Sequence, residues 1–104
     1  DRATAPKNMI IQVTPLKPAC KYRFRAMIKR TGPQWAGAHV IEYEEGPKFV
    51  RSAALNSTRR GQWETLETTF TSHANPRSSA IYLYNYDLDN PVYYDGLELE
   101  EIAR

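Results

Sequence analysis

Hydrophobic and polar residues alternate along this chain, and the alternation is clearest between residues 21 and 29. One set of alternate positions in this segment is apolar or aromatic: Tyr22, Phe24, Ala26 and Ile28. The other set is mostly basic: Lys21, Arg23, Arg25, Met27 and Lys29. Because successive side chains of a strand point to opposite faces, this pattern predicts a β-strand with one dry face.

Other segments show the same alternation or a β-rich composition, and turn signals separate them. The predicted strands lie at residues 9–14, 38–44, 63–71, 80–86 and 92–102, and residues 49–55 are ambiguous. A β-bulge is expected at Asp95-Gly96, and no segment has a sustained helical period. Six or seven short strands with regular turns predict an all-β, antiparallel β-sandwich in a single domain spanning residues 1–104.

Composition and charge reduce the number of possible functions. The 104 residues carry 14 basic and 12 acidic side chains, a balance that argues against a nucleic-acid partner. No stretch of 18 apolar residues is present, so we expect no membrane insertion. His39 and His73 lie far apart in the sequence, and Glu42 and Glu44 have the ordinary spacing of a polar strand face. Since no nucleophile or metalloprotease motif is present either, the chain is predicted not to be an enzyme.

Cys20 is the only cysteine, which excludes an internal disulfide. Because it lies beside strand-forming residues, it is either a half-buried, inert thiol or the partner in an intermolecular disulfide. The sequence leaves both alternatives open.

Tyrosines form the best candidate binding surface. Tyr82, Tyr84 and Tyr86 project from one side of a predicted strand, and Ile81 and Leu83 occupy its other side. Flat aromatic side chains can stack on the apolar faces of sugars, and they lose little conformational entropy on binding. The three tyrosines therefore form either a carbohydrate platform or a surface for cross-strand packing or a neighbouring domain.

Basic residues and a tryptophan extend this candidate. Arg23, Arg25 and Lys29 are expected on the same sheet face as the tyrosines, where they would suit the carboxylate or sulfate of an acidic polysaccharide. Alternatively, they form a solvated strand face that is balanced by glutamates. Trp35 follows a Gly-Pro turn, and it either stacks on sugar at the rim of a cleft or caps one end of the sandwich.

Three stretches together resemble the jelly-roll carbohydrate-binding modules of the galactose-binding-like superfamily. They are a proline segment that runs into a tyrosine-rich strand (12–29), a tryptophan strand (61–71) and a closing strand with an aspartate (81–99). The resemblance covers roughly residues 9–102. The chain departs from the family because it has no glycine at Ala19-Cys20 and because it is shorter, as if the N-terminal strands of the full family domain were missing.

The resemblance implies a non-catalytic module that binds a polysaccharide or oligosaccharide and is accessory to a larger secreted or cell-surface protein. In the family, the face that would carry the tyrosines and basic residues is concave and often binds the glycan. The candidate carbohydrate-binding residues are therefore Tyr82, Tyr84, Tyr86, Arg23, Arg25, Lys29 and Trp35. The alternative is a structural or assembly module that packs against a neighbouring domain or subunit without binding sugar.

Two further roles follow from the resemblance alone. Trp63 matches a family tryptophan that packs in the core. Asp95 matches an aspartate that helps to hold a structural calcium ion, which needs six to eight oxygen ligands. Alternatively, Asp95 is a buried structural residue with a hydrogen-bond partner. Asp87 and Asp89 are interpreted as turn residues.

Overall fold

A computed structural model of the chain describes residues 7–13, 16–43, 49–74, 78–87 and 89–103. These residues form the strands β1 (Lys7–Val13), β2 (Lys21–Arg30), β3 (Ala36–Tyr43), β4 (Phe49–Asn56), β5 (Trp63–Thr71), β6 (Ser78–Asn85) and β7 (Val92–Ala103). The ambiguous segment 49–55 is therefore a strand. No helix forms within these ranges, and so none that could cross a membrane.

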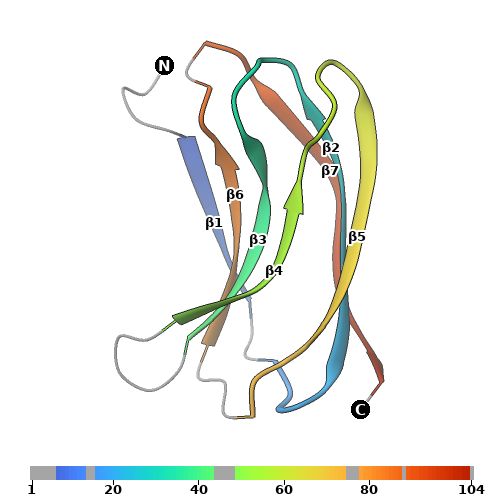
Figure 1. The fold of residues 1–104 in the computed structure, drawn as a ribbon. Coiled ribbons are helices and arrows are strands. Elements are labelled where there is room, and N and C mark those ends of the chain that lie inside the picture. The colour runs from blue at the N-terminus through green and yellow to red at the C-terminus, as the bar shows by residue number, and fades with distance from the viewer. Residues whose placement is uncertain (1–6, 14–15, 44–48, 75–77, 88, 104) are drawn as a thin grey trace.

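Two antiparallel sheets lie face to face (Figure 1). One sheet has the strand order β1-β6-β3-β4, and the other has the order β5-β2-β7. Most paired strands are distant in the sequence, as in β-sandwiches with Greek-key connections. The predicted all-β, antiparallel sandwich is confirmed.

A single layer of apolar side chains fills the space between the sheets. The predicted inward side of β2 is confirmed, since Phe24, Ala26 and Ile28 are fully buried. These residues belong to one core cluster with side chains of the opposite sheet: Ala38, Val40, Ala53, Leu55, Ile81 and Leu83. Burying a side chain as large as phenylalanine or isoleucine contributes about 1.5–3 kcal/mol. The hydrophobic alternation therefore decides which side of each strand remains available for function.

The expected bulge in β7 is also confirmed. Opposite β2, Asp95 pairs with Met27 and Glu98 pairs with Arg25, so that two residues of β7 face one residue of β2. Gly96 has a φ of +60°, a left-handed conformation that favours glycine and is typical of this kind of bulge. The bulge turns Asp95 to the outer face, although Leu97 two residues later packs against the core.

Ser72 ties the turn that leads into β2 to the end of β5. The backbone N–H of Cys20 donates to the Ser72 hydroxyl oxygen at 2.9 Å, and the Ser72 N–H donates to the Cys20 carbonyl at the same distance. The Ser72 hydroxyl also bonds the Lys17 carbonyl oxygen. Between them, Ala19 is held at a φ of +53°, which is strained for a residue with a Cβ. This is the position where the resembled family has a glycine.

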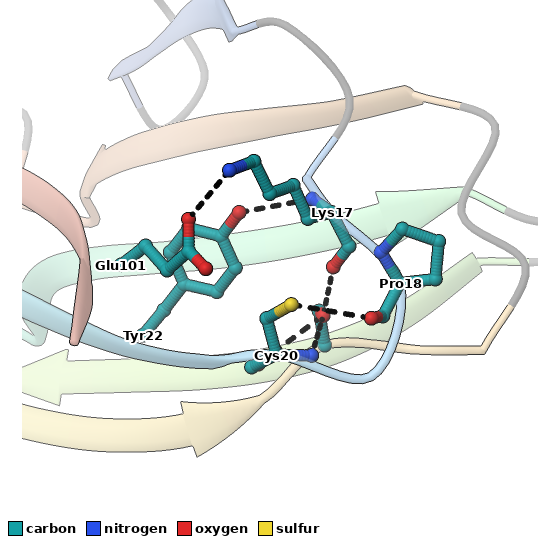
Figure 2. Close-up of polar contacts among 6 residues, drawn as sticks. Lys17, Pro18, Cys20, Tyr22 and Glu101 are labelled. Carbon is teal, nitrogen blue, oxygen red and sulfur yellow. Dashed lines mark hydrogen bonds and ion pairs between the residues drawn. The ribbon is translucent and has the colours of Figure 1, made fainter. Parts of the chain in front are cut away.

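The Cys20 thiol is enclosed at this turn. It is buried and donates a weak hydrogen bond to the Pro18 carbonyl oxygen at 3.3 Å. On the same side, the Lys17 N–H donates to the Tyr22 hydroxyl at 2.9 Å, and the Lys17 ammonium pairs with Glu101 at 3.1 Å (Figure 2). Of the two alternatives for this cysteine, the structure supports the inert thiol.

The interpretation of Glu42 as part of a polar strand face is wrong, because its side chain is fully buried. Its carboxylate accepts hydrogen bonds from the Ser52 hydroxyl at 2.5 Å and from the backbone N–H of His73 at 3.1 Å. Burial of an unpaired carboxylate is costly, so these donors account for its place inside the sandwich. Glu42 thereby links β3 to the segment that follows β5. Glu44 lies outside the described residues.

The strained turn gives a first prediction. Replacing Ala19→Gly should raise the free energy of unfolding by up to about 1 kcal/mol, because relief of the left-handed strain exceeds the added flexibility of the unfolded chain. Urea denaturation measures the change, and Ala74→Gly, which also lies in an exposed non-strand segment, is the comparison. A loss of stability in Ala19→Gly would contradict this account of the turn.

Candidate functional site

The outer face of the four-stranded sheet collects aromatic side chains from its two central strands. Tyr82 and Tyr84 of β6 point away from the core, as the alternation predicts, because Ile81 and Leu83 point into it. Tyr86 follows the strand, and its ring centre lies 5.6 Å from that of Tyr84. The pairing of β6 with β3 adds residues that the sequence analysis did not assign to this surface: His39, Ile41 and Tyr43.

Tyr84 lies across the sheet rather than standing up from it. It pairs with Gly37 of β3, which in turn pairs with Asn56 of β4, so that the three residues form one row. The Tyr84 hydroxyl reaches the Asn56 side-chain oxygen over Gly37, and a Cβ on Gly37 would come within 2.8 Å of that hydroxyl. Tyr84 is therefore only 8% exposed, and it forms the floor of the surface rather than a free stacking ring.

A half-buried tyrosine of the opposite sheet, Tyr94, supports this row from below. The Tyr94 hydroxyl lies 2.8 Å from the Tyr84 carbonyl oxygen and 3.0 Å from the Gly37 carbonyl oxygen, and it donates to them. Burial, and to a lesser extent the nearby Tyr84, raise the pKa of Tyr94 well above the usual value for tyrosine. Tyr94 therefore stays protonated as a donor and ties β7 to β3 and β6 beneath the aromatic face.

A second tyrosine pair encloses a hollow farther along the same face. The hydroxyl oxygens of Tyr43 and Tyr82 lie 2.5 Å apart. Together with His39 and Ile41, these rings line a hollow of about 220 Å³. It opens on the outer face of β3 and β6, and a small side chain, Ala80, pairs with Ile41 beside it.

Arg51 of β4 adds a positive charge to this face. It pairs with Ile41, a residue that lines the hollow. Burial and the nearby Arg51 charge lower the pKa of His39, so the imidazole is neutral at pH 7. The ring of His39 lies 4.6 Å from that of Tyr84. Neutral hydrogen-bonding rings therefore line the hollow, and one guanidinium lies on the neighbouring strand.

Trp35 and Tyr86 form the open end of the aromatic face. The Tyr86 N–H donates to the Trp35 carbonyl oxygen at 2.9 Å, which places the two residues side by side. Trp35 is 67% exposed and Tyr86 is 52% exposed. A hollow of about 360 Å³ lies against Trp35, and its other lining residues come from the sandwich end: Arg30, Pro33, Asn56, Ser57 and Thr58. Of the two alternatives for Trp35, this exposure favours a rim position.

A buried carboxylate shapes the loop beside Trp35. Glu64 accepts hydrogen bonds from the hydroxyl of Ser57 at 2.5 Å, the N–H and hydroxyl of Thr58 at 3.0 and 2.9 Å, and the N–H of Arg59 at 3.3 Å. Burial alone would raise the pKa of Glu64, but these donors together lower it below its usual value. The ionised carboxylate therefore holds the loop that lines one side of the hollow.

The expectation that Arg23, Arg25 and Lys29 share a face with the tyrosines is wrong. They project from β2, whose sheet is β5-β2-β7, so they lie on the opposite side of the sandwich. The Arg23 guanidinium pairs with Glu100, and that of Arg25 lies 4.0 Å from Glu67. Alternation shows which side of a strand faces outward, but it does not show which of the two sheets the strand joins.

The expected burial of Trp63 is also wrong, since its side chain is 48% exposed. On β5, Glu64 takes the inward position beside it, and Trp63 pairs with Lys29 on the outer face. Tyr93 of β7 pairs with the other side of Lys29 and is exposed as well. The outer face of the three-stranded sheet thus carries two aromatic rings of its own.

Asp95 is exposed on that same outer face, contrary to the expected burial within an apolar strand, and its Oδ1 accepts the N–H of Gly96 at 2.8 Å. In the described part of the chain, no group of three or more His, Cys, Asp or Glu residues is placed to hold a metal ion. Calcium needs six to eight oxygen ligands, and its binding at Asp95 stays a prediction. Asp87, by contrast, is a turn residue as expected, and it accepts the N–H groups of Asp89 and Asn90.

An apolar seam lies at the edge of the four-stranded sheet. Met9 and Ile11 of β1 pair with Leu83 and Ile81, which places them on the inward side, yet Met9 is 60% exposed. A hollow of about 280 Å³ opens beside Met9, between β1 and the other sheet. Its lining includes Met9, Leu83 and the β7 residues Val92 and Tyr94.

Comparison with solved structures identifies this arrangement of strands. A structure described as "Family 16 Carbohydrate Binding Module-2" matches with a TM-score of 0.79 and 21% identity, over 96% of this chain and 73% of its own. The chain has a carbohydrate-binding-module fold. No protein-family model matches the sequence, and no curated protein matches it significantly.

Two further structures share the carbohydrate-binding-module fold. One, described as "CBM4 structure and function", has a TM-score of 0.71 and 12% identity over 91% of this chain and 73% of its own. The other contains the CBM22-1 and GH10 modules of a Clostridium thermocellum xylanase, complexed with xylohexaose. It has a TM-score of 0.58 and 8% identity over 93% of this chain and 26% of its own. The fold resemblance deduced from the sequence is therefore confirmed.

The loop carboxylate beside Trp35 gives a prediction about pH. The folded-state pKa of Glu64 lies below its ordinary value of 4.5, so the unfolded state binds more protons in acid. Its stabilising contribution is present above about pH 4.5 and is lost as the pH falls through the folded-state pKa. Glu64→Gln should lower the free energy of unfolding at pH 7 by about 1–3 kcal/mol and by less at pH 3.

Urea denaturation between pH 7 and pH 3 checks this, with the exposed Glu98→Gln as the control. If the wild type and Glu64→Gln lose stability in parallel over this range, the loop is not held by the ionised carboxylate.

Proposed function

We propose that this chain is a non-catalytic glycan-binding module and that its binding surface is the aromatic outer face of the four-stranded sheet. We further propose that it is accessory to a larger secreted or cell-surface protein. On this proposal, the exposed rings of Trp35 and Tyr86 stack on sugar, and the hollow beside Tyr82 takes a neighbouring part of the same glycan.

One observation carries the proposal: outward aromatic residues continue from Tyr82 through Tyr84 to Tyr86, on a sheet whose other side is already the core. At about 3.3 Å per residue, the stretch from Tyr82 to Tyr86 is about 13 Å long, so a chain of sugars fits it better than a single ring. The rings of Trp35 and Tyr86 are exposed at one end of this stretch, and exposed apolar surface in soluble proteins often marks a binding site.

The electrostatics of the face agree with a sugar ligand. His39 is neutral at pH 7, and the hydroxyls of Tyr43 and Tyr82 can donate and accept hydrogen bonds at the hollow. Neutral groups of this kind match the hydroxyls that rim a sugar ring. The similarity to carbohydrate-binding modules and the xylohexaose in one of the similar structures support the same function.

Substitutions on the two faces test the proposal. Trp35→Ala and Tyr86→Ala should each weaken glycan binding about tenfold or more, because each removes a large apolar contact with the sugar. Trp63→Ala is the matched control, since it removes a ring that is also about half exposed but lies on the opposite face. Tyr84 is unsuitable, because its ring is part of the sheet floor and its loss would perturb the fold.

Affinity electrophoresis in gels that contain soluble neutral or acidic polysaccharides measures the binding. We expect retardation of the wild type and of Trp63→Ala, and reduced retardation of Trp35→Ala and Tyr86→Ala. Absence of retardation by every polysaccharide would exclude the proposal, and loss only in Trp63→Ala would move the site to the three-stranded sheet.

The apolar seam favours a second candidate, a structural or assembly module. An inward-facing residue that is 60% exposed, Met9, is an unusual feature for an isolated sandwich and suits packing against a neighbouring domain or subunit. On this alternative, the chain self-associates, and Met9→Gln shifts it toward the monomer because it removes apolar contact area. Sedimentation equilibrium decides this, and a monomer at all concentrations would count against a subunit contact through the seam.

A further inference from the structure

Within the described part of the chain, Arg51 is the one guanidinium that projects with the aromatic rings from the four-stranded sheet. It is exposed, and it lies opposite Ile41, which lines the hollow between Tyr43 and Tyr82. Among the described residues, every glutamate and aspartate lies elsewhere: inside the sandwich, in the turn after β6 or on the other sheet. The charge that the described residues place on the aromatic face is therefore positive.

The charge of Arg51 acts on the rings around the hollow and the floor beside it. It is one cause of the lowered pKa of His39, after burial, and it opposes the burial that raises the pKa of Tyr84. Arg51 thus lies close enough to the platform to act on a ligand that rests there. Its position at the edge strand β4 leaves the guanidinium open to an incoming group.

Two arginines of the opposite face are already paired with glutamates. Arg23 pairs with Glu100, and Arg25 lies within 4.0 Å of Glu67. An anion that approached that face would compete with these carboxylates, whereas on the aromatic face no described carboxylate competes for Arg51. Charge complementarity therefore favours the aromatic face for an acidic ligand.

We propose that the glycan bound on the aromatic face is acidic, with a carboxylate or sulfate group paired to Arg51 and the attached sugar ring packed in the hollow beside Tyr82. This inference rests on the proposed glycan-binding function and specifies its ligand class. The planar guanidinium binds carboxylate and sulfate oxygens through two parallel hydrogen bonds, which a neutral sugar hydroxyl does not match.

The test uses paired polymers and paired variants of the whole chain. Affinity gels contain dextran, dextran sulfate, polygalacturonate or hydroxyethylcellulose, so that sulfate, carboxylate and neutral ligands are compared directly. The variants are Arg51→Gln on the aromatic face and Arg25→Gln on the opposite face, which remove the same charge. Circular dichroism and urea denaturation establish that both variants are folded.

We expect Arg51→Gln to weaken binding to dextran sulfate or to polygalacturonate about three- to tenfold, the range for a partly exposed charged contact. Arg25→Gln should bind as the wild type does, and added salt should weaken the wild-type interaction. Binding to whichever acidic polymer depends on Arg51 identifies the group as sulfate or carboxylate.

Three outcomes would overturn the inference. Equal losses in Arg51→Gln and Arg25→Gln would mean that the acidic polymers bind by general charge attraction. Retention by dextran or hydroxyethylcellulose, with none by the acidic polymers, would exclude an acidic ligand and leave the glycan-binding function intact. Retention by no polymer would remove the proposed function itself, and the ligand class with it.

Discussion

The two sheets share a single layer of apolar side chains. The residues buried in this layer determine which residues of each strand remain on the two outer faces. Val40 of β3 and Ile81 and Leu83 of β6 are buried in this layer, so the aromatic side chains at the alternate positions of these strands lie on the outer face. Because β3 and β6 are the central strands of their sheet, their outward residues meet across the pairing. Tyr94 reaches through the layer from the other sheet and bonds the backbone directly under the rings. Packing of the core thus positions the aromatic side chains on the outer face.

The rings on this face have different degrees of freedom. Tyr84 is fixed by its hydrogen bond to Asn56 and by the bare backbone of Gly37 beneath it, whereas Trp35 and Tyr86 stand open at one end. A fixed floor lowers the conformational entropy that binding must remove, and open rings supply the area that a ligand covers. The buried carboxylate of Glu64 fixes the loop beside Trp35 in the same way, because it accepts hydrogen bonds from backbone N–H groups of that loop.

Local alternation was sufficient to predict most of the fold and part of the site. It placed Phe24 and Ile28 inside and the tyrosines of β6 outside, because each strand has only two sides. It did not reveal that β2 pairs with β5 and β7, since that pairing joins segments far apart in the chain, and so it grouped Arg23 with the wrong rings. Because alternation carries no information about long-range pairing, His39, Tyr43 and Arg51 were not included in the predicted site. The burial of Glu42 and Trp63 was predicted wrongly, in opposite directions. Glu42 is buried because hydrogen bonds satisfy its carboxylate, and Trp63 is exposed because it occupies an outward position of its strand.

The bulge in β7 has a consequence for how this strand can vary. Tyr94 and Leu97 both face inward although they are three residues apart, because Gly96 is an extra residue at this register shift opposite β2. Loss of Gly96 would leave every later side chain on its present face, whereas any other residue there would keep the length and strain a backbone whose φ is +60°. Space is not the obstacle, since a Cβ would lie 3.8 Å from the Met27 sulfur. Deletion of Gly96 is therefore expected to disturb β7 less than its replacement by alanine.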